Sequence, residues 1–521
     1  MPKPTSRRAT HPQGELEPTL GAPVEDTKLD TFGGRVEVLW EPKAEVTALG
    51  PLVYFIQFLK TSGLWERWVE ECPLAYSSNN APPKAGILGG ILITLLAGHR
   101  RYAHINALRH DPVIPPMLGL NGFPCEDSVR RAFLRGDHER YTLWMDQSLN
   151  RTFEPLLTEP WVLDIDATVK TLYGRQEEAK VGYNPTKPGR PSHVYHAYCI
   201  AALRMVLEVE VQAGNQTAPE FAHAGLFGWL DARPRQQWPT LLRGDVAWGT
   251  EKTMAEAEKR DLPYLFKLRQ SDGVKELMRR SVGRTAWAPA GGGWQGVEEV
   301  LQLQGWTRQR RVMVLRRALP QDVAMVDRET DVRQERLVGM VVMNPARPMY
   351  EYAVLVTTAA VKDVLSVAQL YRDRADAENI FDEMKNQWGW SGFTTHDLAR
   401  CQLMARINAL VFNWWSLYTR LALPGKHTEA TTSRPMLVYG LGKKTRHSQQ
   451  TTLTVTSNHG RAKKIQAILT TVGGFLKRFA RSAEQLSGKQ RWALLLKIIL
   501  REFYPKRAGQ TTGQTVNPAL A

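Results

Sequence analysis

The chain has 521 residues, more than one compact core usually holds, so we expect about two to four domains. Hydrophobic residues make up 43% of the sequence and charged residues 23%, which excludes a wholly disordered protein. With 68 Lys and Arg against 52 Asp and Glu, the net charge is +16. This excess favours a polyanionic partner, either nucleic acid or an anionic membrane surface.

The sequence gives no sign of a membrane span or a secretion signal. Its longest apolar run, from Ala85 to Gly98, is too short to cross a bilayer, and residues 1–30 contain no apolar signal core. The four cysteines lie far apart with no CxxC pair, which fits a reducing compartment. We therefore expect a cytoplasmic protein without a membrane partner.

Taken in chain order, residues 1–30 are predicted to be a flexible tail, since they are rich in Pro, Thr and charge. Residues 31–157 show helical periodicity, and we predict a helical N-terminal DNA-binding region there. Residues 158–271 alternate strand-like runs rich in Val, Ile and Tyr with two helical segments. That alternation predicts an α/β layer with a mixed sheet.

The second half of the chain is predicted to return to helices. Residues 272–350 contain strand-like runs that predict a separate β-rich insertion. Residues 351–395 then supply a last strand and a long helix from Val364 to Trp388, and residues 396–507 are predicted to be mainly helical, with Gly/Thr/Ser-rich breaks around 425–460. Residues 508–521 are predicted to be a polar tail.

Most of the positive charge lies in one segment near the C-terminus. From Arg434 to Arg507 only Glu484 and Glu502 are acidic, and the segment nets +14 of the whole charge of +16. It can be a helical domain with a solvated basic face, or a surface that neutralises DNA phosphates. The size of the asymmetry favours the DNA-binding surface.

Two carboxylate segments are candidates for metal chemistry. Alternation places Asp164 and Asp166 on one face of a strand, opposite apolar neighbours. Such acids need a cation or hydrogen bonds to offset their desolvation, so a metal role for at least one competes with a purely structural one. Asp245 follows an apolar strand, where either a ligand or a helix cap is common.

The helix from Val364 to Trp388 presents a third candidate. Four of its polar side chains fall within an arc of about 60° at about 100° per residue: Tyr371, Arg374, Glu378 and Lys385. An exposed helix with an i,i+4 ion pair explains part of this pattern and contributes little stability. A phenol and two cations beside a carboxylate also suit phosphate contacts around a metal ligand.

These residues resemble a known family. Tyr371-x2-Arg374-x3-Glu378-x6-Lys385 resembles the Y-R-E-K signature of bacterial insertion-sequence transposases of the DDE class. LDIDAT and RGDVAWG resemble the first and second aspartate segments of that class. Three further stretches are similar to group 1 DDE transposases, and the resemblance runs from about residue 35 to 500: GHRRYAHINALRHDPV, KVGYNPTKPGRPSHVYH and NQWGWSGFTTHDLARCQLMARIN.

The resemblance implies an RNase H-like mixed sheet with a β-rich insertion, flanked by N- and C-terminal helical regions. Asp166 would lie on the first strand, Asp245 after the fourth and Glu378 on a late helix. Asp166 is preferred because the family's aspartate is closely followed by Thr, and Asp164 stays in reserve. The three carboxylates would be the catalytic metal ligands, while Arg374 and Lys385 bind DNA phosphates and Tyr371 positions the backbone.

Three converging carboxylates without Cys or His partners suit two Mg²⁺ or Mn²⁺ ions and in-line phosphoryl transfer. The resemblance therefore implies a nucleoid-associated transposase that cuts at inverted-repeat ends in double-stranded DNA and joins the 3′-OH ends to target DNA. A homodimer would handle the two ends together. Two alternatives stay open: an RNase H-fold nuclease without strand transfer, and a catalytically inactive repressor that binds the ends.

Overall fold

The structure is a computed structural model that describes residues 27–76, 78, 80–284, 286–319, 349–361, 363–425 and 427–502. The chain divides into two compact units, Met1–Glu45 and Val46–Ala521. In the first unit the described residues form an antiparallel hairpin of β1 (Thr27–Thr31) and β2 (Gly34–Val38). The end of the predicted 1–30 tail is thus strand β1, whereas residues 1–26 and the predicted 508–521 tail lie outside the described residues.

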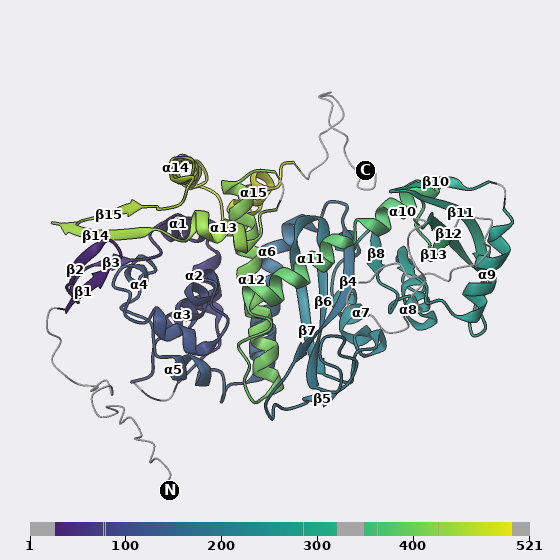
Figure 1. The fold of residues 1–521 in the computed structure, drawn as a ribbon, viewed down its shortest axis with the longest axis horizontal. Coiled ribbons are helices and arrows are strands. Elements are labelled where there is room, and N and C mark those ends of the chain that lie inside the picture. The colour runs from purple at the N-terminus through teal and green to yellow at the C-terminus, as the bar shows by residue number, and fades with distance from the viewer. Residues whose placement is uncertain are drawn as a thin grey trace, which may run out of the picture. The chain divides into compact units, whose positions relative to one another are not determined.

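The second unit begins with helices. They are α1 (Leu52–Ser62), α2 (Leu64–Glu71), α3 (Lys84–Leu96), the 3-10 turn η1 (Tyr102–Ala107), α4 (Ile114–Met117), α5 (Glu126–Arg131) and α6 (His138–Phe153) (Figure 1). Helix α3 is buried from Gly86 to Leu96, as expected of its apolar run. Asp137 begins α6 by accepting hydrogen bonds from the Glu139 and Arg140 amides, so local capping sets this boundary.

A large mixed sheet follows. Among the described residues it has ten strands: β4 (Val162–Thr171), β5 (Lys180–Val181), β6 (Pro191–Ile200), β7 (Met205–Ala213), β8 (Leu241–Gly244), β9 (Tyr264–Lys267), β10 (Ala288–Gly291), β11 (Trp294–Leu301), β12 (Arg310–Ala318) and β13 (Tyr350–Thr357). Their order is β10-β11-β12-β13-β9-β8-β4-β6-β5, and β7 also pairs with β6. Strand β8 runs parallel to both β4 and β9, while the other pairs are antiparallel. The mixed α/β sheet predicted from sequence is confirmed.

Helices and short turns connect these strands and complete the unit. They are η2 (Glu154–Leu156), η3 (Ala201–Leu203), η4 (Pro219–Phe221), α7 (His223–Asp231), η5 (Arg235–Gln237), α8 (Glu251–Glu258), α9 (Asp272–Val282), α10 (Val364–Arg372), α11 (Ala375–Glu383), the π-helical turn η6 (Met384–Trp388), α12 (Leu398–Ala422), α13 (Ala430–Leu437), α14 (Ala462–Ser482) and α15 (Gly488–Ile499). A smaller sheet has the order β15-β14-β3, from β3 (Val46–Thr47), β14 (Leu441–His447) and β15 (Gln450–Thr456).

The structure differs from the expected elements in three places. The strands expected to form a separate insertion, β10 to β12, extend the large sheet through β13 instead, because β12 pairs with β13 and β13 with β9. Helix α9 occupies the first part of the 272–350 segment, ahead of the strand-like runs that predicted its β-rich character. The Gly/Thr/Ser-rich stretch around 425–460 contains the β14–β15 hairpin, which threonines favour through their β propensity.

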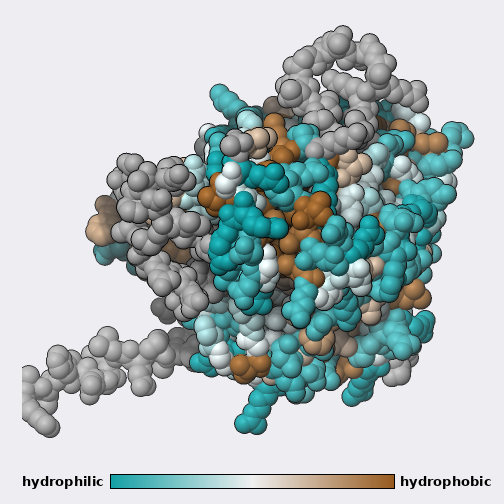
Figure 2. Space-filling view, turned by 90° about the vertical axis from the view of Figure 1, so that its right-hand side faces the viewer, coloured by the Kyte–Doolittle hydropathy of each residue, from teal (hydrophilic) through white to brown (hydrophobic). Residues whose placement is uncertain are grey.

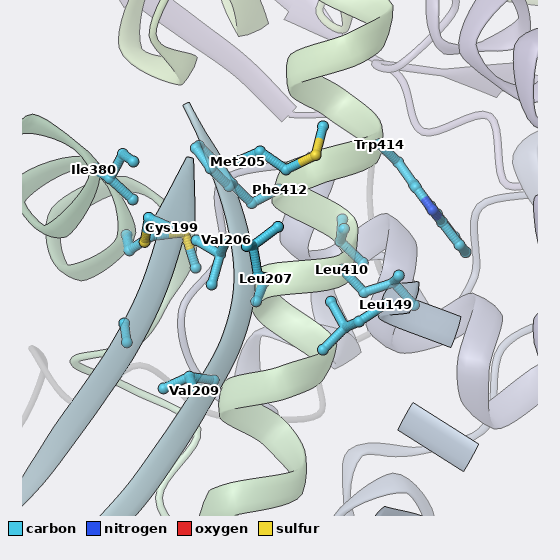
Figure 3. Close-up of a cluster of buried hydrophobic side chains, with 14 of the residues drawn as sticks. Leu149, Cys199, Met205, Val206, Leu207, Val209, Ile380, Leu410, Phe412 and Trp414 are labelled. Atoms are coloured by element: carbon cyan, nitrogen blue, oxygen red, sulfur yellow. The ribbon is translucent and has the colours of Figure 1, made fainter. Parts of the chain in front are cut away.

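The core packs the central sheet between helices. Figure 3 shows Ile380 of α11 on one side of β6 and β7, and Leu410 and Phe412 of α12 on the other. Leu149 of α6 joins the α12 side. This sandwich fixes α11 against the sheet, and α11 carries the predicted catalytic glutamate.

The face of the molecule formed around β10, β11 and α9 is largely polar. Figure 2 views the molecule from the side of β10, β11 and α9, and hydrophilic residues cover most of that face around smaller hydrophobic areas. Within the described ranges, no helix combines the length and apolar character that a membrane crossing requires.

Candidate active site

Two of the predicted catalytic carboxylates lie at neighbouring positions in the sheet. In the parallel pair β4–β8, Ile165 is in register with Gly244. Asp166 is the next residue on β4, and Asp245 is the first residue after β8, so both follow directly on the last paired position of the two strands. The Asp166 carboxylate accepts a hydrogen bond from the Ala167 amide at 2.7 Å, and that of Asp245 from the Ala247 amide at 3.0 Å.

Asp164, on the same strand, has a different environment. It is 1% exposed, and its two carboxylate oxygens accept hydrogen bonds from Arg243 of β8 at 2.6 and 2.9 Å. Arg243 also donates to the Leu370 carbonyl at the end of α10. Asp164 therefore belongs to a buried ion pair that ties two strands and a helix together. The sequence offered one signal for this partner: an arginine inside the buried run LLRG requires a compensating acid.

The predicted helix from Val364 to Trp388 is divided into three parts. Helix α10 ends at Arg372 and α11 starts at Ala375. After α11 the chain widens into the π-helical turn η6, which Gly389 ends at φ 105°. The four polar residues therefore do not share one regular helical face, as a continuous helix would require. At the break, the Arg374 amide bonds to the Tyr371 carbonyl at 3.1 Å and its side chain is buried against the sheet.

Arg374 joins the sheet carboxylate to the helix carboxylate. Its Nη1 lies 2.9 Å from Asp166 Oδ2 and its Nη2 lies 2.6 Å from Glu378 Oε1. The Arg374 side chain is only 4% exposed, whereas that of Glu378 is 50% exposed. The break between α10 and α11 thus brings Asp166 and Glu378, 212 positions apart in the sequence, to one guanidinium.

Lys385 reaches the same strand from the π-helical turn. Its Nζ donates to Thr168 Oγ1 at 3.1 Å, two residues beyond Asp166 on β4. Burial lowers the pKa of Lys385, and the nearby charge of Asp382 opposes that effect. The ring of Tyr371 lies 5.8 Å from the Arg374 guanidinium carbon. Tyr371, Arg374 and Lys385 are therefore gathered on the β4 side of the helical segment.

Strand β4 carries a further buried lysine, Lys170, which the sequence pattern did not single out. Lys170 is 6% exposed, and its Nζ donates to the Gly392 carbonyl at 2.5 Å. Burial lowers its pKa to about 8. The Phe393 amide bonds in turn to the Arg100 carbonyl at 3.1 Å, and the Arg100 guanidinium donates to the Asn386 carbonyl at 2.7 Å. Arg100 of GHRR and Phe393 of WGWSGF thus contact one another, and Lys170 joins WGWSGF to strand β4.

The site is rich in hard oxygen donors, but Arg374 lies between two of them. Across the described residues, no three His, Cys, Asp or Glu side chains are grouped closely enough to hold a metal ion. The structure thus brings Asp166 and Glu378 together through Arg374 and places Asp245 at the adjacent strand end.

Comparisons with known proteins place the chain in a family. A search of curated proteins found no match. A solved structure of a piggyBac transposase synaptic complex with hairpin DNA is similar at a TM-score of 0.37 and 12% sequence identity, over 89% of this chain and 87% of that one. The family model for the transposase DDE domain group 1 matches residues 79–472, well over half of the sequence. The chain belongs to this family of DDE transposases.

Proposed function

We propose that this DDE transposase serves a bacterial insertion sequence. It binds the inverted-repeat ends of the element as double-stranded DNA, cleaves there by metal-dependent phosphoryl transfer, and joins the freed 3′-OH ends to target DNA. One observation carries the proposal: Asp166 from a central strand and Glu378 from a late helix meet at one buried guanidinium, and Asp245 directly follows the adjacent parallel strand.

We also propose that the central strands form an RNase H-like core. The order β7-β6-β4-β8-β9, with β6 antiparallel to its neighbours and β4, β8 and β9 parallel, supports this assignment. In this order β4 is the first strand along the chain and β8 the fourth. Asp166 then lies on the first strand and Asp245 directly after the fourth, where the family resemblance expects them.

The carboxylates suit divalent cations by their chemistry, with Arg374 in the place between Asp166 and Glu378 that a cation would take. Carboxylates on a strand, a strand end and a helix offer the oxygen ligands that Mg²⁺ and Mn²⁺ prefer. The negative charge of Asp166 and Glu378 already attracts a cationic group, since Arg374 hydrogen-bonds to both. Asp166, Asp245 and Glu378 would hold the ions, and two such ions supply activation of the attacking oxygen and stabilisation of the leaving oxygen.

The basic groups around the carboxylates would bind and orient the DNA. Arg374 and Lys385 carry positive charge next to Asp166 and Thr168, where phosphates of the transposon end must approach. Their burial strengthens their electrostatic interactions and limits their motion. Tyr371, beside the Arg374 guanidinium, would position the sugar–phosphate backbone.

Because an element has two ends, we propose that two copies act together in a synaptic homodimer. We propose further that the protein works on the nucleoid of the bacterial cytoplasm.

The carboxylate assignment is tested with Asp166→Asn, Asp245→Asn and Glu378→Gln. Each variant should lose cleavage of a plasmid that carries the gene with its flanking DNA, while its DNA affinity, measured by fluorescence anisotropy, stays close to wild type. Asp382→Asn, which changes an acid on the same helix, is the matched control and should still cut. If one of the three variants cuts like wild type, the residue that it replaces is not catalytic.

A further inference from the structure

The hairpin of β14 and β15 is a two-stranded ribbon with little core of its own. Its seven residue pairs run without interruption from Leu441 opposite Thr456 to His447 opposite Gln450. A two-residue turn closes it, with Ser448 at φ 55°. At about 3.3 Å per residue the ribbon is roughly 20 Å long, and it lies between α13 and α14 in the chain (Figure 1).

The two faces of the ribbon differ. On the inner face Gly442 is buried and packs closely on Gly50, while Lys444 Nζ lies 3.4 Å from the Pro112 carbonyl. Strand β14 also pairs with β3 at Gly442 and Lys443, at the end of the ribbon away from its turn. These contacts hold the base of the ribbon on the helical body.

The side chains of the outer face are exposed. Its side chains alternate along each strand with those of the inner face and include one exposed leucine, Leu441. The other seven are exposed polar side chains: Lys443, Thr445, His447, Gln450, Thr452, Thr454 and Thr456. All seven can donate hydrogen bonds and none is a carboxylate. The sequence contains no Asp or Glu from Arg434 to Ala483.

Further positive charge follows directly. Arg461, Lys463 and Lys464 are exposed at the start of α14, a few residues after β15 ends. Polar side chains also protect an edge strand from aggregation. Protection alone accounts for the threonines and for some lysines, but not for the absence of every acid over this stretch.

We propose that the outer face of the β14–β15 ribbon binds in the major groove of double-stranded DNA. That groove is about 12 Å wide and accepts a two-stranded β-ribbon. Thr445, Thr452 and Thr454 then hydrogen-bond to base edges. Lys443 and the basic start of α14 bind the flanking phosphates. A ribbon of this length spans about six base pairs. The inference rests on the proposed function for its choice of DNA as partner.

The test uses the full-length protein and a fluorescein-labelled duplex of the gene's flanking DNA. Lys443→Ala with Lys463→Ala should weaken binding and reduce the slope of log affinity against log salt by about 2, since two phosphate contacts are lost. The matched control, Arg279→Ala with Arg280→Ala on α9, removes the same charge and should leave the slope unchanged. An equal effect of both pairs would overturn the proposal.

Groove contact is tested separately. Thr445→Val, Thr452→Val and Thr454→Val together keep the strand shape but remove three hydroxyls. Wild type should protect guanine N7 atoms in the major groove from methylation, and the triple variant should lose that protection. Unchanged protection, or competition by double-stranded RNA as strong as by DNA, would contradict the inference. Glu378→Gln should bind and protect like wild type; if that variant still cuts, the proposed catalytic role fails while the ribbon inference stands.

Discussion

Asp164 and Asp166 share one face of β4, yet their surroundings give them different chemistry. Asp164 is enclosed with Arg243 inside the sheet, so both charges are matched and inaccessible. Asp166 is 14% exposed at its side chain and shares Arg374 with Glu378. The difference in burial and in ion-pair partner thus makes Asp164 a structural residue and leaves Asp166, two residues away, as a residue of the candidate site.

We predict that Asp164→Asn is strongly destabilising and Asp166→Asn much less so. Loss of the Asp164 charge leaves Arg243 buried without its ion partner, which costs about 3–5 kcal/mol. In Asp166→Asn the Arg374 guanidinium retains Glu378, so no buried charge is left alone. Urea unfolding followed by circular dichroism measures both changes, and similar losses in the two variants would refute this division of roles.

The residues of the site could be named from sequence, but their contacts could not. Spacing alone singled out Arg374, Glu378 and Lys385, because a helix repeats every 3.6 residues. Spacing could not show that the Arg374 side chain contacts Asp166, because that contact depends on the interruption of the helix between α10 and α11. Nor could it pair Asp164 with Arg243, which are brought together only by the register of two parallel strands.

At the scale of elements, Glu383 fastens the end of α11. It is fully buried, and its carboxylate accepts hydrogen bonds from His427 Nε2 at 2.8 Å, the Ala430 amide at 2.9 Å and Trp388 Nε1 at 3.1 Å. These bonds tie the helix that carries Glu378 to the start of α13. Burial raises the pKa of Glu383. The hydrogen bond and charge of His427, together with the other two donors, lower the pKa by more than burial raises it, so the pKa of Glu383 is below its usual value.

We predict that Glu383→Gln lowers stability at pH 7 by about 1.5–3 kcal/mol, the contribution of a hydrogen bond to a charged group. Because the folded pKa is depressed, this contribution is present above the usual carboxyl pKa of 4.5 and is lost as pH falls through the lower folded value. Urea unfolding of both proteins at pH 7 and in the acid range checks it. The difference in unfolding free energy between variant and wild type should shrink in acid. A difference that is the same at both pH values would show that the charge of Glu383 does not contribute to stability.

The sequence could predict where strands lie along the chain, but not which strands pair with each other in the sheet. Alternation predicted strands in the 272–350 region, but a period of two does not say which strand lies beside which. Pairing of β12 with β13 and of β13 with β9 makes these strands part of the central sheet. The β14–β15 hairpin was hidden because threonine and glycine are common in both loops and exposed strands.

At the scale of the whole second unit, the basic C-terminal segment is part of the fold rather than an appendage. Helices α14 and α15 bury Leu476, Phe479, Trp492 and Leu495 in the same core as α1 and α12. Their opposite faces carry the exposed Lys and Arg side chains. Removing the segment would therefore expose core residues as well as remove charge, and surface substitutions are the cleaner probe of DNA binding.

The most direct measurement maps new 3′-OH ends on the gene's own flanking DNA at nucleotide resolution. Purified wild type and Glu378→Gln are each incubated with that DNA, with and without Mg²⁺. We expect discrete Mg²⁺-dependent nicks at the element boundaries with wild type and none with the variant. Binding without nicks from wild type, scattered cuts, or nicks from Glu378→Gln equal to those of wild type would contradict this expectation.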